Sequence, residues 1–322
     1  MSLKKKVILL LSMLHSAAIF AQFDSQRTQY MYDISAYNPG AVADKNLFNV
    51  TGDYRLQWAG FSNAPNDVAV LADMPFGSGE SKHGAGISFL SESIGLFQNQ
   101  SFMVQYAYRL KIWNGYMGLG VSVGAISQSF EYGDVDLTGN DGNDIDGDQS
   151  HSSDDSMIPS SDQNDMSFDA AFGAYYSDEK MYVGLSFLHL NSPKFDFGEY
   201  DKVKMQPIMY LIGGYDFEMS NTDYHFKPSV LLATNFSSSQ ADLDCLLEYK
   251  KKIQGGLAYR FGDSFGFLFG VENIIEGLFL GYSYDLPVSG MIKSGGSHEI
   301  CLKYSFKLDF SRKDGYKSER IL

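Results

Sequence analysis

Large apolar residues alternate with polar residues in the segment 299–310, near the carboxyl end of the chain. The even-numbered positions from Ile300 to Phe310 are all large and apolar, whereas the odd-numbered positions are mostly charged or small and polar. A repeat of two residues predicts a β-strand with one apolar and one polar face. In a soluble sandwich the apolar face would pack in a core. In an outer-membrane barrel it would contact lipid, while the polar face lines the lumen.

The same alternation recurs along most of the chain and favours the barrel. In the segment 48–59, Asp53 and Arg55 share one face and Tyr54 and Trp58 share the other, a combination that fits poorly in a two-sheet core. We count about 14 such segments, an even number as expected for a single-chain antiparallel barrel. The predicted strands are 48–59, 67–74, 83–90, 99–110, 116–130, 167–177, 180–190, 207–219, 224–236, 241–249, 251–261, 264–272, 276–285 and 298–310.

Short and long connections alternate between these strands. With both termini in the periplasm, the inner connections are expected to be short and the outer loops long. The short ones are 111–115, 178–179, 220–223 and 273–275, and the long ones include 131–166, 191–206 and 286–297. The Gly- and Ser-rich inner connection 75–82 is longer than usual, which we interpret as a flexible turn rather than a contact for a periplasmic partner.

The amino-terminal residues 1–21 read as a secretory signal peptide. Three lysines precede the apolar run from Val7 to Leu14, and small residues lead to a predicted cleavage after Ala21. The run is too short to cross a bilayer, and no later segment approaches about 18 uninterrupted apolar residues. We therefore expect export to the outer membrane of a Gram-negative bacterium, with no transmembrane helix.

Composition agrees with an all-β transmembrane antiparallel barrel. The 322 residues include 32 Gly, 21 Tyr and 24 Phe, which suits strands with small inward residues and aromatic girdles. Mean hydropathy is −0.18, a value compatible with strands that are polar on one side. The only two cysteines, Cys245 and Cys301, are predicted on the lipid and lumen faces respectively, so we expect no disulfide between them.

Much of the net charge of −14 comes from one predicted outer loop. The segment 131–166 holds 11 of the 39 acidic residues and no Lys or Arg. Asp144, Asp146 and Asp148 alternate around a glycine in a way that resembles a calcium loop, but the first and last ligand positions of that motif are absent. We interpret the segment as a solvated loop, with calcium binding as the alternative.

No catalytic, cofactor-binding or nucleic-acid-binding motif emerges. The sequence Ser297-His298-Glu299 contains the residue types of a hydrolase triad, yet neighbouring residues of a strand point to opposite faces. The histidines are scattered without metal-ligand spacing, and neither a phosphate-binding loop nor a basic stripe is present. These observations predict a protein that is not an enzyme.

The residues between the signal peptide and the first strand form a distinct unit. We divide the chain into a signal peptide at 1–21, a periplasmic or plug segment at 22–47, the barrel at 48–310 and a periplasmic tail at 311–322. Tyr30, Met31, Tyr32 and Tyr37 need burial but lie on no predicted strand, so we expect this segment to pack in or under the lumen and to narrow it.

Two blocks of sequence resemble the PorP/SprF family of the type IX secretion system. The first comprises Gln29-Tyr30-Met31-Tyr32, Tyr37-Asn38-Pro39-Gly40 and the segment 54–65, and the second comprises the segments 281–285 and 295–300. Together they bracket nearly the whole mature chain. The motif residues, which we expect to serve the plug or a partner, are Gln29, Tyr30, Met31, Asn38, Pro39, Arg55, Gln57, Trp58, Gly60, Pro65, Tyr282, Tyr284, Asp285, Ser297, His298 and Glu299.

This resemblance implies an outer-membrane protein that helps particular cargo proteins to reach or remain at the cell surface. It also implies partners among the periplasmic proteins or lipoproteins of the machinery, and links to gliding motility and adhesin secretion in some members. A barrel of about 14 strands is too narrow for a folded protein, so we expect an accessory or scaffold and not the conduit. The polar strand faces alone would also permit a solute channel, which is the alternative.

Overall fold

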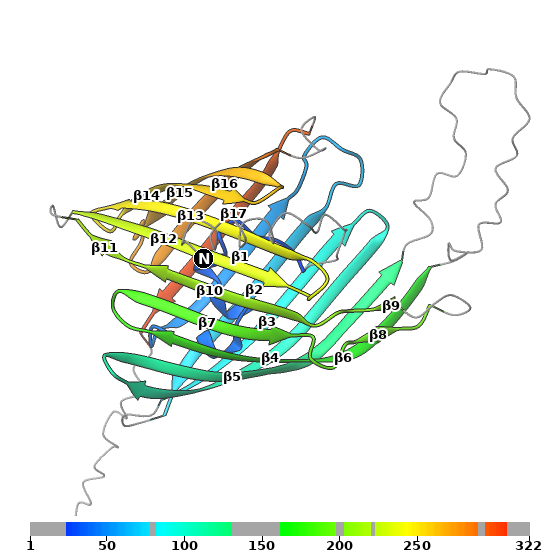
Figure 1. Ribbon diagram of the computed structural model, residues 1–322, viewed down its shortest axis with the longest axis horizontal. Helices are drawn as coiled ribbons and strands as arrows, with labels where there is room; N and C mark the ends of the chain where they lie inside the picture. Colours follow the sequence, from blue (N-terminus) through cyan, green and yellow to red (C-terminus); the bar gives the residue numbers. More distant parts are fainter. Residues whose placement is uncertain are drawn as a thin grey trace, which may run out of the picture.

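A computed structural model describes residues 24–77, 82–130, 162–197, 203–219, 223–288 and 294–307 of the chain, and these residues form a closed antiparallel barrel (Figure 1). The predicted signal peptide, most of the acidic loop including Asp144, Asp146 and Asp148, and the predicted tail lie outside the described residues. Within the described ranges, no helix has the length and apolar character needed to cross a bilayer.

Fourteen long strands build the wall. In chain order they are β1 (Phe48–Leu56), β2 (Asn66–Phe76), β3 (Lys82–Ile94), β4 (Phe97–Ile112), β5 (Gly115–Phe130), β6 (Gln163–Ser177), β7 (Met181–Leu188), β10 (Ile208–Tyr215), β12 (Tyr224–Thr234), β13 (Ser239–Tyr249), β14 (Ile253–Arg260), β15 (Ser264–Glu272), β16 (Leu278–Pro287) and β17 (Ser297–Phe306). The two-residue β11 (Phe217–Glu218) continues β10 after a break at Asp216. Each long strand coincides with one predicted segment, which confirms the all-β barrel of about 14 strands.

Neighbouring strands pair in sequence order around the wall, and the pairing of the first strand with the last closes it. The pairing of β1 with β17 places Arg55 opposite Glu299. The long connection after β7 does not interrupt the wall, because β7 pairs directly with β10, which then pairs with β12. The barrel therefore has no long free edge in the part of the wall that is described.

The two faces of the wall have the predicted character. On β1, Val50 and Tyr54 are exposed, whereas Thr51, Asp53 and Arg55 are buried in the interior. Cys245 is exposed on the outside and Cys301 is buried inside, and both thiols are free. The alternation along the sequence thus identified which side chains face outward and which face the lumen.

Several strand ends differ from the prediction. The first strand stops at Leu56 and not at Ala59, because the Gln57 amide bonds to the Pro65 carbonyl and Trp58 has a φ of 52°. A turn thus begins three residues earlier than the apolar pattern suggested. The last strand ends at Phe306 rather than at Phe310, since Lys307 is not in a strand and 308–310 lie outside the described residues.

The long connection after β7 contains a hairpin that the sequence did not predict. The short strands β8 (Lys194–Phe195) and β9 (Val203–Lys204) pair with each other, and Phe195 and Phe197 pack against Ile126 of β5. We call this end of the barrel, which also carries the connections 57–65 and 288–296, the long-loop end. The opposite short-turn end carries the turns 113–114, 178–180 and 250–252.

Candidate functional site

Residues 24–46, here called the plug, lie inside the barrel (Figure 1, dark blue). They contain three 3₁₀ turns, η1 (Tyr30–Tyr32), η2 (Ile34–Ala36) and η3 (Pro39–Ala41). Such short turns leave many backbone groups without a partner inside the turn, so the plug must find partners on the wall. The contacts below show that it does so on most sides of the lumen.

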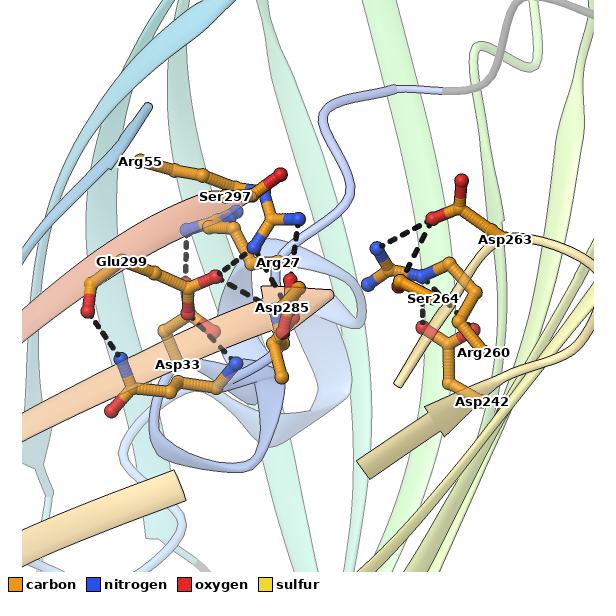
Figure 2. Close-up of polar contacts among 12 residues, drawn as sticks. Arg27, Asp33, Arg55, Asp242, Arg260, Asp263, Ser264, Asp285, Ser297 and Glu299 are labelled. Carbon is orange, nitrogen blue, oxygen red and sulfur yellow. Dashed lines mark hydrogen bonds and ion pairs between the residues drawn. The ribbon is translucent and has the colours of Figure 1, made fainter. Parts of the chain in front are cut away.

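A buried cluster of charges, here called the charged latch, holds the start of the plug against β1, β16 and β17 (Figure 2). Arg55 bonds to Glu299 at 2.8 Å and to Asp285 at 2.7 Å, and all three side chains are at most 2% exposed. The Glu299 carboxylate also accepts the backbone amides of Thr28 and Gln29, each at 2.8 Å. One carboxylate therefore joins the arginine of the wall to the backbone of the plug.

A second buried ion pair lies on the neighbouring wall (Figure 2). The Nε atom of Arg260 donates to both Asp242 oxygens, at 3.1 and 3.2 Å, and the same guanidinium is 3.5 Å from Asp263. Thr28 reaches toward this wall by donating its hydroxyl to Asp285 at 2.7 Å. Within the plug, Arg27 pairs with Asp33. Each of these two arginines, like the one in the charged latch, is therefore paired with at least one carboxylate inside the lumen.

His189 anchors the plug at the long-loop end. Its Nε2 lies 3.0 Å from Asp24 of the plug and its Nδ1 lies 3.0 Å from Asp169 of β6. Burial disfavours the imidazolium, but the charges of Asp24 and Asp169 and their hydrogen bonds outweigh this effect and raise the pKa of His189 to about 10. At neutral pH the ring is thus a cation between two carboxylates.

The middle of the plug lies on a strip of wall that lacks side chains. A Cβ added to Gly118, Gly120 or Gly173 would lie 2.1–2.2 Å from atoms of the segment Asn38–Gly40. We call these three residues the glycine trough. The close approach lets Asn38 donate to the Ala174 carbonyl at 3.1 Å while its side-chain oxygen caps η3 at the Gly40 amide.

Aromatic residues of the plug pack on the next part of the wall, formed by β10 and β12. Tyr30 and Tyr37 form a buried cluster with Tyr210, Ile212 and Leu231. The Tyr30 hydroxyl donates to Ser229 at 3.2 Å, so its polar end is also satisfied. The tyrosines that the sequence marked for burial are therefore the apolar anchors of the plug.

Polar groups of the wall secure the end of the plug nearest the short turns. Arg109 donates to the carbonyls of Ala43 and Asp44 and to the Asn46 side chain. Lys303 donates to the Tyr32 carbonyl at 2.7 Å. Wall side chains thus donate hydrogen bonds to backbone carbonyls of the plug at this end.

Two cavities lie on opposite sides of the plug and share no lining residue. The first, here called the chamber, has a volume of about 100 Å³ and lies toward the long-loop end, between Tyr37 and Pro39 of the plug and Met205 after β9. The second, the vestibule, has a volume of about 460 Å³ and lies at the short-turn end under Tyr32 and Ile34.

The two sequence blocks meet at the long-loop rim. The Ala59 amide donates to the Gly296 carbonyl at 2.8 Å, and the Trp58 amide donates to the Ser297 hydroxyl at 3.2 Å. Gly60 has a φ of 96°, which a glycine adopts without strain. The blocks are therefore neighbours in space although they are more than 200 residues apart in the chain.

The predicted motif residues divide into four groups. Gln29, Tyr30, Asn38 and Pro39 belong to the plug contacts described above, with Met31 packed beside Tyr30, and Arg55, Asp285 and Glu299 form the charged latch. Gln57, Trp58, Gly60, Pro65 and Ser297 lie at the rim. Tyr282, Tyr284 and His298 face outward, where the Tyr282 hydroxyl lies 2.8 Å from His298 Nδ1.

The outward direction of His298 also separates it from Ser297 and Glu299, which are buried inside. The three adjacent residues therefore cannot form the relay of a hydrolase. Among the described residues, no group of three or more His, Cys, Asp or Glu side chains is arranged to hold a metal ion.

Sequence reasoning missed several residues that hold the plug. His189, Arg109, Thr28 and the glycine trough were not singled out, although the inward positions of Arg109 and of the glycines follow from the strand alternation. For His189 the sequence offers no comparable signal, because it follows a strand and its partners come from distant segments.

The fold and the site define a transmembrane β-barrel whose lumen is occupied by its own amino-terminal segment. Residues 19–304 match the family described as type IX secretion system membrane protein PorP/SprF, and the chain belongs to this family. A comparison with curated protein sequences gave no match.

Solved structures with a similar fold include barrels at low sequence identity. The Ralstonia pickettii toluene transporter TbuX is 11% identical, with 84% of this chain and 92% of that chain covered and a TM-score of 0.46. The P. putida toluene transporter TodX is 8% identical, with 84% and 92% covered and a TM-score of 0.45. The NanC porin is 11% identical, with 81% and 100% covered and a TM-score of 0.34.

Proposed function

We propose that the chain is a non-enzymatic outer-membrane barrel that serves type IX secretion as an accessory or scaffold. It supports the export or the surface attachment of a specific cargo such as an adhesin. Its partners are periplasmic proteins or lipoproteins of the secretion machinery, and the signal peptide at 1–21 directs its export. Membership of the PorP/SprF family supports the link to secretion.

The observation that favours a scaffold over a conduit for cargo is the plug inside the lumen. The wall bonds it through Glu299 and Lys303 of β17, Arg109 of β4 and His189 after β7. Even barrels of 16–18 strands, wider than this one, form only solute channels. A folded cargo could not pass a lumen that is narrower and also filled.

Two surfaces remain for partners in this proposal. The rim formed by the two sequence blocks faces the long-loop end, and the vestibule opens at the short-turn end. A scaffold needs access to both sides of the membrane, because it must contact the surface cargo and the periplasmic components. The barrel therefore acts by holding partners in place, with one contact surface on each side of the membrane.

A solute channel is the second candidate. The two cavities on either side of the plug and the polar inner wall would suit the passage of small molecules if the plug moved. This function requires that the hydrogen bonds from Thr28 and Gln29 to the carboxylates of Glu299 and Asp285 be broken in the open state. Losing buried hydrogen bonds to charged groups is unfavourable, which favours the scaffold.

Affinity capture of the tagged full-length chain from detergent-solubilised membranes tests the proposal. We expect recovery of secretion-system components or of one surface adhesin, and a tagged barrel of another family from the same membranes is the control. Capture of no such protein, together with steady currents from the purified chain in planar bilayers, would identify a channel and refute the scaffold.

A further inference from the structure

The chamber combines an apolar lining with buried polar atoms that have no partner. Leu71, Met103 and Ile126 contribute apolar side chains to its wall. The Ser122 hydroxyl, one Asp169 oxygen and the Arg27 Nε atom also border it, and each is buried without a hydrogen-bond partner among the described residues. Polar groups in such positions are normally paired, so their partner is expected to be a molecule inside the chamber.

Water alone satisfies this arrangement poorly. A buried water makes about three hydrogen bonds and therefore needs a site with several polar groups within reach. Of the 23 residues that border the chamber, eleven are polar or charged, but ten are proline, methionine or aliphatic residues, whose side chains offer water no partner. A molecule with an apolar body and one polar group matches both parts of the lining.

We propose that the chamber is a binding site for a small organic molecule that carries one hydroxyl or amide group on an aliphatic body. The Ser122 hydroxyl and the free Asp169 oxygen bind its polar group, and Met103 and Ile126 contact its apolar part. An apolar cavity of roughly 150 Å³ accepts benzene, which has six non-hydrogen atoms, so the chamber of about 100 Å³ accepts a smaller molecule of roughly four or five non-hydrogen atoms. This site is independent of the scaffold role.

The position of the chamber links such a ligand to the plug. Tyr37 and Pro39 of the plug and Met205 after β9 border the chamber from opposite directions. A ligand in the chamber contacts the plug only when the plug lies in its position inside the lumen. Binding is therefore expected to raise the thermal stability of the barrel, as any ligand of the folded state does.

Isobutanol, with five non-hydrogen atoms, is a suitable probe. The full-length chain in detergent is titrated with it, and binding is followed by saturation-transfer NMR and by the unfolding temperature. We expect a saturable signal that Ala171→Leu abolishes, because Ala171 borders the chamber and a larger side chain fills it. Phe172→Leu is the matched control, since Phe172 is the next residue of β6 and faces outward.

Ser122→Ala tests the polar contact without adding bulk. We expect it to weaken isobutanol about three- to tenfold, which corresponds to the loss of one neutral hydrogen bond. The proposal is overturned if the unmodified chain gives no saturable signal, which would indicate a void or bound water only. It is also overturned if Ala171→Leu leaves binding unchanged, or if Ser122→Ala binds isobutanol as tightly as the unmodified chain.

Discussion

At the scale of single residues, Arg55 shows how a buried charge is stabilised inside this barrel. A guanidinium with 1% of its side chain exposed has lost its hydration, and this cost is offset only because Asp285 and Glu299 lie within 2.8 Å. Glu299 in turn accepts two backbone amides of the plug. The group that balances the arginine thus also fixes the position of the plug.

Replacing Arg55 by leucine should therefore destabilise the barrel strongly. Two buried carboxylates would lose their countercharge, and removing one member of such a group costs about 3–5 kcal/mol. The free energy of unfolding in detergent or lipid measures the loss. Lys250→Met is the control, because it removes a pair with Asp223 whose side chains are about half exposed, and we expect no measurable change. Equal stability of Arg55→Leu and the unmodified chain would contradict the role of the charged latch.

The His189 anchor predicts a pH dependence. The pKa of His189 is raised to about 10 in the folded state, above the ordinary value of 6.5, because Asp24 and Asp169 outweigh the effect of burial. Its stabilising contribution is complete below pH 6.5 and is lost as the pH rises toward 10. His189→Gln should therefore lose less stability than the unmodified chain between pH 6.5 and 10. Unfolding curves across this range measure the difference, and parallel curves for the two proteins would refute the charged anchor.

At the scale of elements, the strands follow from the sequence because lipid and lumen impose opposite demands on neighbouring residues. A slip by one residue would expose Asp53 and Arg55 to lipid, so the register is strongly determined. Strand ends follow less closely, as at Leu56, because a turn can begin while the apolar alternation continues. The β8–β9 hairpin depends on the packing of Phe195 against Ile126, a contact between distant segments that local alternation does not contain.

The plug was predictable in outline but not in its contacts. Unplaced tyrosines indicated that the segment before the first strand is buried, and the inward faces of Arg55 and Glu299 indicated a charged lumen. Which wall atom meets which plug atom depends on the closure of the barrel, which brings β1 beside β17. Local periodicity carries no information about that closure, so His189 and the glycine trough emerged only from the structure.

The glycine trough leads to a prediction about one element. A methyl group at Gly120 would lie 2.2 Å from the backbone of Pro39, so Gly120→Ala must displace η3 from the wall. We expect a loss of about 1–3 kcal/mol in the free energy of unfolding and faster proteolysis of the plug. Gly52→Ala is the matched control, because no atom lies within 4 Å of its added Cβ. Identical proteolysis of both variants would show that η3 does not depend on the trough.

At the scale of the whole molecule, we expect the plug to decide whether the barrel conducts. The wall encloses a polar lumen, but the plug occupies it between the chamber and the vestibule and bonds to β1, β4, β7 and β17 or their ends. These bonds would all have to break together for the lumen to open. A wall of this size with the plug in place is therefore expected to remain closed on the timescale of a single-channel record.

Deletion of residues 22–43 should convert the closed barrel into a conducting one. The purified unmodified chain is expected to give no large steady pores in planar bilayers, whereas the deletion variant should give steady ion currents because its polar lumen is no longer filled. Gly52→Ala, which leaves the plug untouched, serves as the closed control. Because the deletion also removes Thr28 and Gln29, which bond to Glu299, and Ala43, which bonds to Arg109, the variant must first be shown to form a heat-modifiable barrel in detergent. Large steady pores in the intact chain would mean that the plug leaves the lumen readily, and the solute channel would then be the better account of the fold.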